Sequence, residues 1–162
     1  MDEPHPSPGT LRDKLRTAAL GFAGGLRLAM PFAVESAYLA REGPDIADGG
    51  WTLDLLARRR VAVLLGLGAV AEIAIDKTPY PPTRVDPLPL AGRVMASGSA
   101  CALSCLAEGR TSTSGALIGS VSAVAGSVFG YTMRTRLPLP GWLLAVAEDL
   151  LALALGLWGV QH

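Results

Sequence analysis

The sequence is poor in charged residues, in histidine and in cysteine. Only 17% of its 162 residues are charged, and it has two cysteines and two histidines. Metal ligation by Cys101 and Cys105 would need further cysteine or histidine ligands, but His5 and His162 stand at the two ends of the chain. Two cysteines also indicate no disulfide framework. We therefore expect no metal and no other cofactor, and we interpret the cysteines as small packing residues.

Several functional motifs are missing as well. The chain has no Gly-x4-Gly-Lys-Ser/Thr loop, no His-Glu-x2-His motif and no Gly-x-Ser-x-Gly motif. It also has no basic stripe with interleaved aromatic residues, so no nucleic-acid partner is indicated. The arginines at positions 58–60 are interpreted instead as a membrane-flanking cluster that could meet anionic lipid headgroups.

Long stretches with little charge predict a membrane protein. A helix needs roughly 17 to 25 mostly apolar residues to cross a hydrocarbon core of about 30 Å. Five segments approach that length: Thr17–Ala40, Val61–Ile75, Pro89–Ala107, Gly115–Met133 and Leu139–Val160. We therefore predict an all-α, polytopic membrane helical bundle with about five transmembrane helices. The second and third segments are the weakest, and for either one a buried helix of a soluble protein is the alternative.

The N-terminal region is predicted to be a tail followed by a single transmembrane domain. Residues 1–9 are acidic and rich in proline, which is unlike the basic start of a cleaved signal peptide, and we expect them to be disordered. The domain would comprise residues 10–162, and Thr10 is a candidate N-cap for the first helix.

Lysine and arginine residues near the span ends predict the orientation. With five spans, seven of them lie on the side of the N-terminus: Arg12, Lys14, Arg16, Lys77, Arg84, Arg134 and Arg136. Five lie on the other side: Arg41, Arg58, Arg59, Arg60 and Arg110. This narrow excess favours a multi-pass protein of the inner (plasma) membrane with a cytoplasmic N-terminus and an external C-terminus. So near a balance is also what a protein of dual orientation would show.

Two short patterns each occur twice and in the same order. Phe-x4-Arg-x3-Pro stands at residues 22–31 and again at 129–138, and Ala-Val-Ala-Glu stands at 69–72 and again at 145–148. Because one predicted span separates the two pairs, spans one and two would face the opposite way from spans four and five. The sequence therefore predicts an inverted repeat, an arrangement of transporters whose substrate site lies near the midplane between the halves.

Charged residues inside the predicted spans are candidate site residues. Arg27 and Glu35 would lie on nearly one face of span one, with Pro31 halfway between them. Proline has no N–H to give to the carbonyl of Arg27, so it should weaken the helix there, and Pro138 should do the same beside Arg134. Broken helices expose backbone dipoles to an ion or polar substrate. The alternative is that Arg27 pairs with a glutamate inside the protein and that Pro31 is a tolerated kink.

Carboxylates form a second group of candidates. Glu72 and Asp76 share one face at the end of span two, and Glu148 and Asp149 open span five. Carboxylates in a low dielectric either pair with cations or take up protons, which suits proton or cation coupling. They could equally be structural partners for the arginines.

These residues also carry a family resemblance. Its elements are Glu72-x3-Asp76-Lys77-x-Pro79-x2-Pro82-x-Arg84-x2-Pro87-x5-Arg93, Gly24-Gly25-Leu26-Arg27-x3-Pro31, Gly130-Tyr131-x2-Arg134 and Glu148-Asp149. Together they resemble the bacterial membrane family catalogued as domain of unknown function 4126, over about residues 18–158. The resemblance implies a compact polytopic protein of the actinobacterial type and implies no activity. The chain departs from the broader family at Leu88, where an arginine would stand before Pro89.

We therefore expect a small transporter or channel for an ion or small polar solute, with a charged midplane site. The candidate binding residues are Arg27, Glu35, Glu72, Asp76, Lys77, Arg84, Arg93, Arg134, Glu148 and Asp149, and Pro31 and Pro138 are the helix-breaking residues. The first alternative is a membrane-embedded enzyme that uses Glu72 and Asp76 as an acid/base pair on a lipid-linked substrate. The second is a non-catalytic assembly partner whose charges are structural. Three Gly-x3-Gly spacings and the few spans favour a homo-oligomer, most often a dimer.

Overall fold

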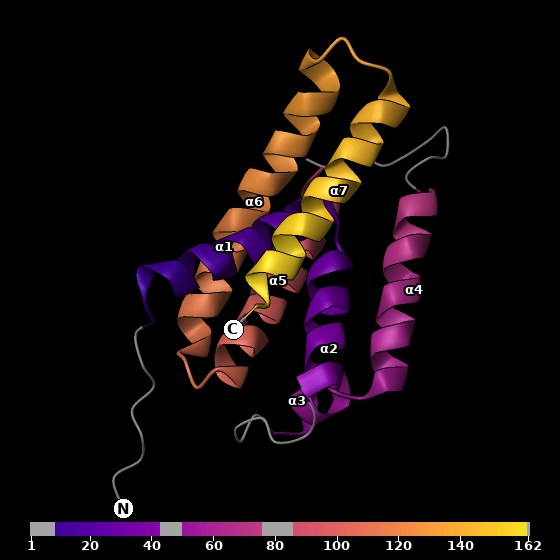
Figure 1. Ribbon diagram of the computed structural model, residues 1–162. Helices are drawn as coiled ribbons and strands as arrows, with labels where there is room; N and C mark the ends of the chain where they lie inside the picture. Colours follow the sequence, from indigo (N-terminus) through magenta and orange to yellow (C-terminus); the bar gives the residue numbers. More distant parts are fainter. Residues whose placement is uncertain (1–8, 43–49, 76–85, 162) are drawn as a thin grey trace, which may run out of the picture.

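The fold is all-helical over the part of the chain that the computed structural model describes, residues 9–42, 50–75 and 86–161 (Figure 1). The helices are α1 (Leu11–Leu26), α2 (Met30–Glu42), α3 (Gly50–Leu56), α4 (Arg59–Ile75), α5 (Pro87–Ala107), α6 (Ser112–Arg136) and α7 (Gly141–Gly159). The all-α prediction is confirmed. Three candidate site residues, Asp76, Lys77 and Arg84, lie outside the described residues, as does the predicted tail up to Pro8.

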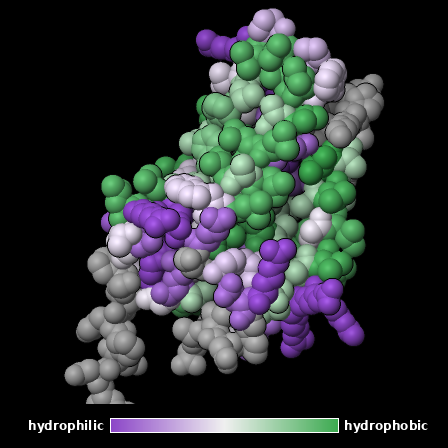
Figure 2. Space-filling model, in the orientation of Figure 1, coloured by the Kyte–Doolittle hydropathy of each residue, from purple (hydrophilic) through white to green (hydrophobic). Residues whose placement is uncertain are grey.

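Three of the described helices are long and apolar enough to cross a membrane. They are α5 with 21 residues, α6 with 25 and α7 with 19. Their outer faces carry large apolar side chains at helical spacing, such as Leu117, Val121 and Val128 on α6. Their inner faces carry small residues, and Figure 2 shows hydrophobic side chains across the middle of the visible surface. Apolar residues turned outward and small residues turned inward are typical of membrane helices.

The first predicted span is not one helix. α1 ends at Leu26 and α2 begins at Met30, and the two helices run in opposite directions. The start of α1 adjoins the α5–α6 turn, where Arg110 donates a hydrogen bond to Thr17. The end of α2 returns to that same end, where Leu39 packs near Leu103 of α5. The segment Thr17–Ala40 therefore forms a helical hairpin that enters and leaves the bundle at one end, and we call α1, α2 and their turn the re-entrant hairpin.

The re-entrant hairpin reaches only part of the way through the bundle. At about 1.5 Å per residue, α1 is about 24 Å long and α2 about 20 Å, so each is shorter than a hydrocarbon core of about 30 Å. α1 begins with a capping box in which Thr10 and Asp13 bond to each other's backbone N–H, which confirms Thr10 as the N-cap. Since α4 has only 17 residues, the five-span bundle is not confirmed.

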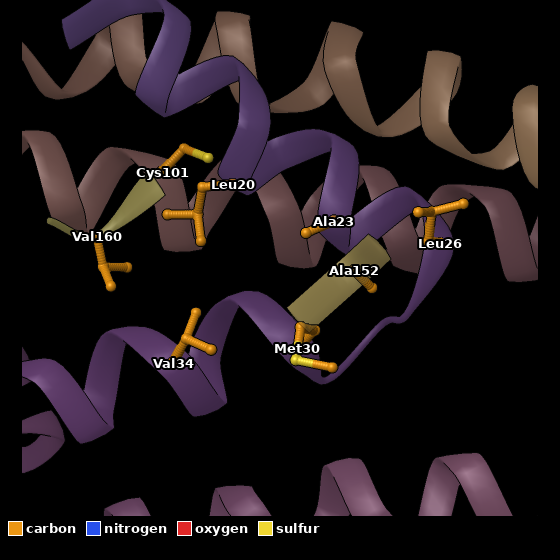
Figure 3. Close-up of a cluster of buried hydrophobic side chains, with 8 residues drawn as sticks. All are labelled: Leu20, Ala23, Leu26, Met30, Val34, Cys101, Ala152 and Val160. Atoms are coloured by element: carbon orange, nitrogen blue, oxygen red, sulfur yellow. The ribbon is translucent and has the colours of Figure 1, made fainter. Parts of the chain in front are cut away.

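Small residues of α7 allow that helix to pack against both arms of the re-entrant hairpin. A Cβ on Gly156 would lie 3.3 Å from Val34 of α2, and a Cβ on Gly159 would lie 2.9 Å from Leu20 of α1. The resulting apolar core joins side chains from four helices (Figure 3): Leu20, Ala23, Leu26, Met30, Val34, Cys101, Ala152 and Val160. The hairpin is therefore an integral part of the core and not a surface appendage.

The glycine spacings serve packing within this chain. A Cβ on Gly21 would lie 2.6 Å from the carbonyl oxygen of Gly119, and a Cβ on Gly25 would collide with the backbone of Ala123. These contacts bring α1 and α6 together closely, as expected of Gly-x3-Gly faces. Cys101 and Cys105 are buried and contact Gly115 on the other side of α6, in agreement with their interpretation as packing residues.

The structure does not confirm the inverted repeat. α1 and α6 run in the same direction, because Gly21 faces Gly119 and Gly25 faces Gly126 further along both helices. α4 and α7, which carry the two Ala-Val-Ala-Glu patterns, run in opposite directions, since α4 ends and α7 begins on the side of the hairpin turn. No single inversion relates both pairs. The two phenylalanines of the first pattern, Phe22 and Phe129, instead contact each other with ring centroids 5.6 Å apart.

Candidate functional site

The candidate site is built around the turn of the re-entrant hairpin. Residues Arg27, Leu28 and Ala29 are not helical, so α1 ends and α2 begins inside the bundle. A helix end leaves backbone carbonyls without partners at its C-terminus and N–H groups without partners at its N-terminus. Where such ends lie within a membrane, these groups need hydrogen bonds from the protein itself, because lipid tails offer none.

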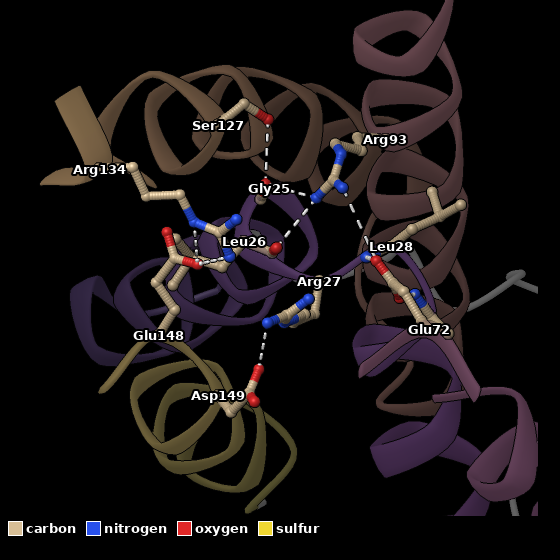
Figure 4. A network of polar contacts seen from close by, with 11 residues as sticks. Gly25, Leu26, Arg27, Leu28, Glu72, Arg93, Ser127, Arg134, Glu148 and Asp149 are labelled. Carbon is tan, nitrogen blue, oxygen red and sulfur yellow. Dashed lines mark hydrogen bonds and ion pairs between the residues drawn. The ribbon is translucent and has the colours of Figure 1, made fainter. Parts of the chain in front are cut away.

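The carbonyls at the end of α1 are capped by side chains of two other helices (Figure 4). Arg93 of α5 donates from one guanidinium nitrogen, Nη1, to the carbonyl oxygens of Gly25 at 2.9 Å and Leu26 at 3.0 Å. Ser127 of α6 donates from its hydroxyl to Gly25 at 3.1 Å. A cation at a helix C-terminus also meets the negative end of the helix dipole, so Arg93 stabilises this end twice over.

The N–H groups at the start of α2 are capped by a carboxylate from α4. Leu28 and Ala29 each donate from the backbone to one oxygen of Glu72, both at 2.8 Å. A carboxylate is favoured at a helix N-terminus for the same electrostatic reason that a cation is favoured at the other end. Glu72 also lies 3.7 Å from Arg93, so one ion pair links the caps of the two half-helices.

Two further ion pairs tie the arginines of the repeated pattern to neighbouring residues of α7. Arg27, whose side chain is 2% exposed, lies 2.5 Å from Asp149. Arg134 donates from Nε and Nη2 to a single oxygen of Glu148, at 3.1 and 2.7 Å, and the Glu148 side chain is fully buried. The arginines of both copies of the pattern therefore contact the same turn of α7 (Figure 4). Arg27 reaches it from the connection after α1, and Arg134 reaches it from α6.

The charges of this cluster balance. We call it the hairpin-turn cluster, and its six ionisable members are Arg27, Arg93, Arg134, Glu72, Glu148 and Asp149. Three guanidinium groups face three carboxylates, so the cluster carries no formal net charge. Burying ions costs free energy unless each is paired and hydrogen-bonded, and removing one partner leaves an uncompensated charge. All six charged residues must therefore be present together if the hairpin-turn cluster is to lie in a membrane interior.

Most of the predicted site residues that the structure describes meet here. All six ionisable members of the hairpin-turn cluster were predicted from the sequence. Glu35 is fully buried further along α2, and the prediction that it shares a helical face with Arg27 is wrong, because the helix ends between them. Pro31 lies in the first turn of α2, directly after the break, as expected of a helix-breaking residue.

The prediction for Pro138 is wrong. α6 continues through Arg134 to Arg136, and Pro138 lies in the connection to α7. Proline removes a hydrogen bond to the carbonyl four residues earlier, but the carbonyls of the last helical turn have no such bond to lose. Pro138 therefore follows a helix end and does not create one.

Sequence reasoning missed the partners that are not ionisable. Ser127 and the backbone groups of Gly25, Leu26, Leu28 and Ala29 complete the hairpin-turn cluster. The only available signal was the position of Ser127 directly after Gly126, on a glycine-lined face where a hydroxyl can reach the backbone of a neighbouring helix.

The polar groups of the site are charged side chains and hydrogen-bonding backbone groups. Among the residues that the structure describes, no three His, Cys, Asp or Glu side chains are grouped so as to hold a metal ion. Both oxygens of Glu72 accept backbone hydrogen bonds, which does not suit a general base that must exchange protons with a substrate.

No protein-family model, no curated protein and no solved structure matches the chain.

Proposed function

We propose that the protein is a small integral membrane transporter or channel for an ion or a small polar solute, and that the solute passes the hairpin-turn cluster. The observation that carries the proposal is the break between α1 and α2 inside the bundle. Side chains from other helices cap the backbone carbonyls at the end of α1 and the backbone N–H groups at the start of α2. Interrupted membrane helices are a recurrent way of presenting backbone dipoles to ions and polar substrates.

The two caps can be exchanged for a solute. A cation could take the place of Arg93 at the carbonyls of Gly25 and Leu26, and an anion could take the place of Glu72 at the N–H groups of Leu28 and Ala29. The side chains of Arg93 and Glu72 are partly exposed, at 12% and 21%. α4, which carries Glu72, packs mainly on α2 and α3 at the edge of the bundle (Figure 1), so its carboxylate can move with the least disturbance of the core.

The re-entrant hairpin changes the proposed membrane topology. We propose four crossings, α4 to α7, with both ends of the described chain in the cytoplasm. Eight basic residues gather at the end where α1 begins: Arg12, Lys14, Arg16, Arg41, Arg58, Arg59, Arg60 and Arg110. Of the described residues, Arg136 and also Arg134, which belongs to the hairpin-turn cluster, lie towards the opposite end. By sequence, the connection between α4 and α5 adds Lys77 and Arg84 to that side, so the count is eight basic residues against four, where five spans gave seven against five, and the positive-inside rule favours a cytoplasmic basic end.

Residue-specific labelling tests this topology. Leu11 at the basic end and Leu139 in the α6–α7 connection are both exposed. In intact cells, a membrane-impermeant thiol reagent should label Leu139→Cys and leave Leu11→Cys unlabelled until the cells are opened. Labelling of both positions from outside, or of Leu11→Cys alone, would refute the proposed topology.

Flux measurements test the function. The full chain is reconstituted in vesicles, and the passage of protons, sodium, potassium, chloride and small polar solutes is compared with that of empty vesicles. We expect a flux that changes in Glu72→Gln and in Arg93→Gln and is kept in Arg136→Gln, which removes an exposed arginine outside the cluster. If no solute passes, and the variants alter stability alone, the transport proposal fails.

A second candidate is a non-catalytic assembly partner. It is favoured by one observation, namely that every ionisable member of the hairpin-turn cluster has a partner within the chain. In that case the arginines and carboxylates hold the helices together and do nothing else. The flux experiment separates the two candidates, because only transport requires the cluster to change partners.

Family membership and oligomeric state are proposals too. The motifs that resemble domain of unknown function 4126 supply all six ionisable members of one cluster, which supports the resemblance. A homo-oligomer stays our proposal, but the Gly-x3-Gly faces at Gly21, Gly25 and Gly119 are used within the chain. A dimer would therefore need another face.

A further inference from the structure

Three consecutive arginines mark the corner between α3 and α4. Arg58 lies in the connection, and Arg59 and Arg60 are the first two residues of α4. All three are exposed, and within the described parts of the chain no carboxylate or other side chain bonds to them. A cluster of like charges with no internal partner repels itself unless an anion from outside lies against it.

A groove begins at two of these arginines and continues over apolar side chains. It is a shallow, widely open depression of about 600 Å³, and the described residues along it are Arg59, Arg60, Val63 and Leu64. These positions lie on one face of α4, one helical turn apart, so the charged part of the groove is at the end of the helix and the apolar part lies further in. Leu67 and Val70, both exposed, extend the apolar strip along the same helix.

The strip is open to the membrane. α4 turns Val61 and Leu65 toward the cluster formed by Leu39, Leu53 and Leu56, and among the described residues its opposite face stays exposed, with Val63 at 55% and Leu64 at 66%. Glycines in the same stretch leave room as well, since a Cβ on Gly66 or Gly68 would have no atom within 4 Å. Figure 2 shows the same division at this edge, with hydrophilic residues at the lower end and hydrophobic residues above them.

We propose that this groove binds an anionic phospholipid. Its phosphate lies against the guanidinium groups of Arg59 and Arg60, which match the geometry of phosphate oxygens, and one acyl chain lies over Val63, Leu64 and Leu67. The two arginines are followed along α4 by apolar side chains, just as the charged headgroup of a phospholipid is followed by its acyl chains. The site is independent of the proposed transport function and of the hairpin-turn cluster.

Other occupants fit this face less well. A second copy inserted in the membrane the same way and related by a two-fold axis along the membrane normal would bring its arginines to the same depth as those of the first copy, where like charges repel. A free phosphate would leave Val63 and Leu64 without a partner. An anionic phospholipid matches both parts of the groove, because its phosphate can pair with the arginines and its acyl chain can cover the apolar side chains. Such lipids are enriched in the cytoplasmic leaflet, where the proposed topology places this end.

Native mass spectrometry of the purified full chain tests the proposal. Phosphatidylglycerol and phosphatidylcholine are added at equal amounts, and the retained lipid is counted per protein. Two arginines near an anionic headgroup should favour phosphatidylglycerol by about tenfold or more. The double variant R59Q/R60Q should lose this preference, R59K/R60K should keep most of it, and R12Q/K14Q, which removes two exposed basic residues at the same end, should leave it unchanged.

The apolar half of the groove has its own test. V63S/L64S should weaken retention of phosphatidylglycerol although both arginines remain, and glycerol 3-phosphate at the same concentration should not displace the lipid. Equal retention of the two lipids by the wild-type protein, an unchanged preference in R59Q/R60Q, or displacement by glycerol 3-phosphate would overturn the proposal. Cross-linked dimers of Val63→Cys that persist in excess phosphatidylglycerol would also overturn it, in favour of a second copy.

Discussion

Two segments of this chain share the pattern Phe-x4-Arg-x3-Pro, but their backbones adopt different conformations around the arginine. In the first copy the helix ends just before Arg27, and the chain reverses. In the second copy the helix runs through Arg134 and ends two residues later, at Arg136. The difference lies in the surroundings, because the first arginine is followed by backbone groups that Arg93 and Glu72 cap. Both copies contain the proline, so the proline alone does not account for the difference between them.

Removal of the first arginine should have the largest effect on this comparison. Arg27→Ala leaves Asp149 beside a cavity without its cation, and the loss of one partner of a buried pair costs about 3 to 5 kcal/mol of unfolding free energy. Unfolding by denaturant in detergent micelles measures the difference. A loss below about 1 kcal/mol, the range of exposed pairs, would show that Arg27 is not buried as described.

The close approach of the first copy to α6 gives the next largest effect. Gly25→Ala would drive a methyl group into the backbone of Ala123, and overpacking of this kind costs about 1 to 3 kcal/mol. The matched control is Gly92→Ala on α5, where a Cβ meets nothing within 4 Å. The control should be neutral or slightly stabilising, because alanine favours a helix over glycine. Equal effects of the two variants would contradict the α1–α6 packing.

The caps of the break should contribute less than the buried pair. Glu72→Gln and Arg93→Gln each weaken the capping of one half-helix, and loss of a cap costs about 0.5 to 2 kcal/mol. Hydrogen exchange of Leu28 and Ala29 should speed up in Glu72→Gln. Arg136→Gln, in the last turn of α6, should stay within about 0.5 kcal/mol of the wild type.

The prolines themselves should matter little for the path of the backbone. Spin labels at Leu15 and Arg41, both exposed, should lie nearer to each other in the wild type than one continuous helix would place them, since the chain changes direction between α1 and α2. One continuous helix would separate them by about 39 Å. We expect the short distance to persist in Pro31→Ala and in Pro138→Ala. A shift to the long distance in Pro31→Ala would show that the proline holds the break.

The smallest effect concerns the start of α1 and depends on pH. Hydrogen bonds from the Thr10 backbone and hydroxyl hold the pKa of Asp13 below its ordinary value. The ionised carboxylate therefore stabilises the folded state above that ordinary value, and this contribution disappears as pH falls through the lowered pKa. Asp13→Asn should fray the first turn at neutral pH and remove this acid dependence. Helix content followed by circular dichroism between neutral and acid pH measures both, and an acid transition unchanged in the variant would contradict the assignment.

Much of the fold and of the site followed from local pattern. Long apolar stretches with few charges located α5, α6 and α7, because length and composition suffice to recognise a helix that could cross a membrane. Charges inside such stretches pointed to Arg27, Arg93 and Glu148, since buried ions need partners wherever they occur.

The reversal of the chain did not follow from local pattern. Pro31 predicted a weakened helix at Arg27 but no reversal, because the apolar residues on either side add up to the length of a single span. The caps that permit the reversal come from Glu72 and Arg93, far along the chain. Hydropathy cannot distinguish two half-helices from one span when the evidence lies in contacts between distant segments.

The small-residue face of α7 has a consequence for how the protein is made. Gly156 and Gly159 pack against the two arms of the re-entrant hairpin, and Asp149 pairs with Arg27 near the opposite end of the sequence. During synthesis, α1 and α2 therefore leave the ribosome long before the helix that completes their core and neutralises their arginine. α1 can pack on α6 before α7 is made, but the re-entrant hairpin reaches its full set of contacts only when α7 enters the bundle.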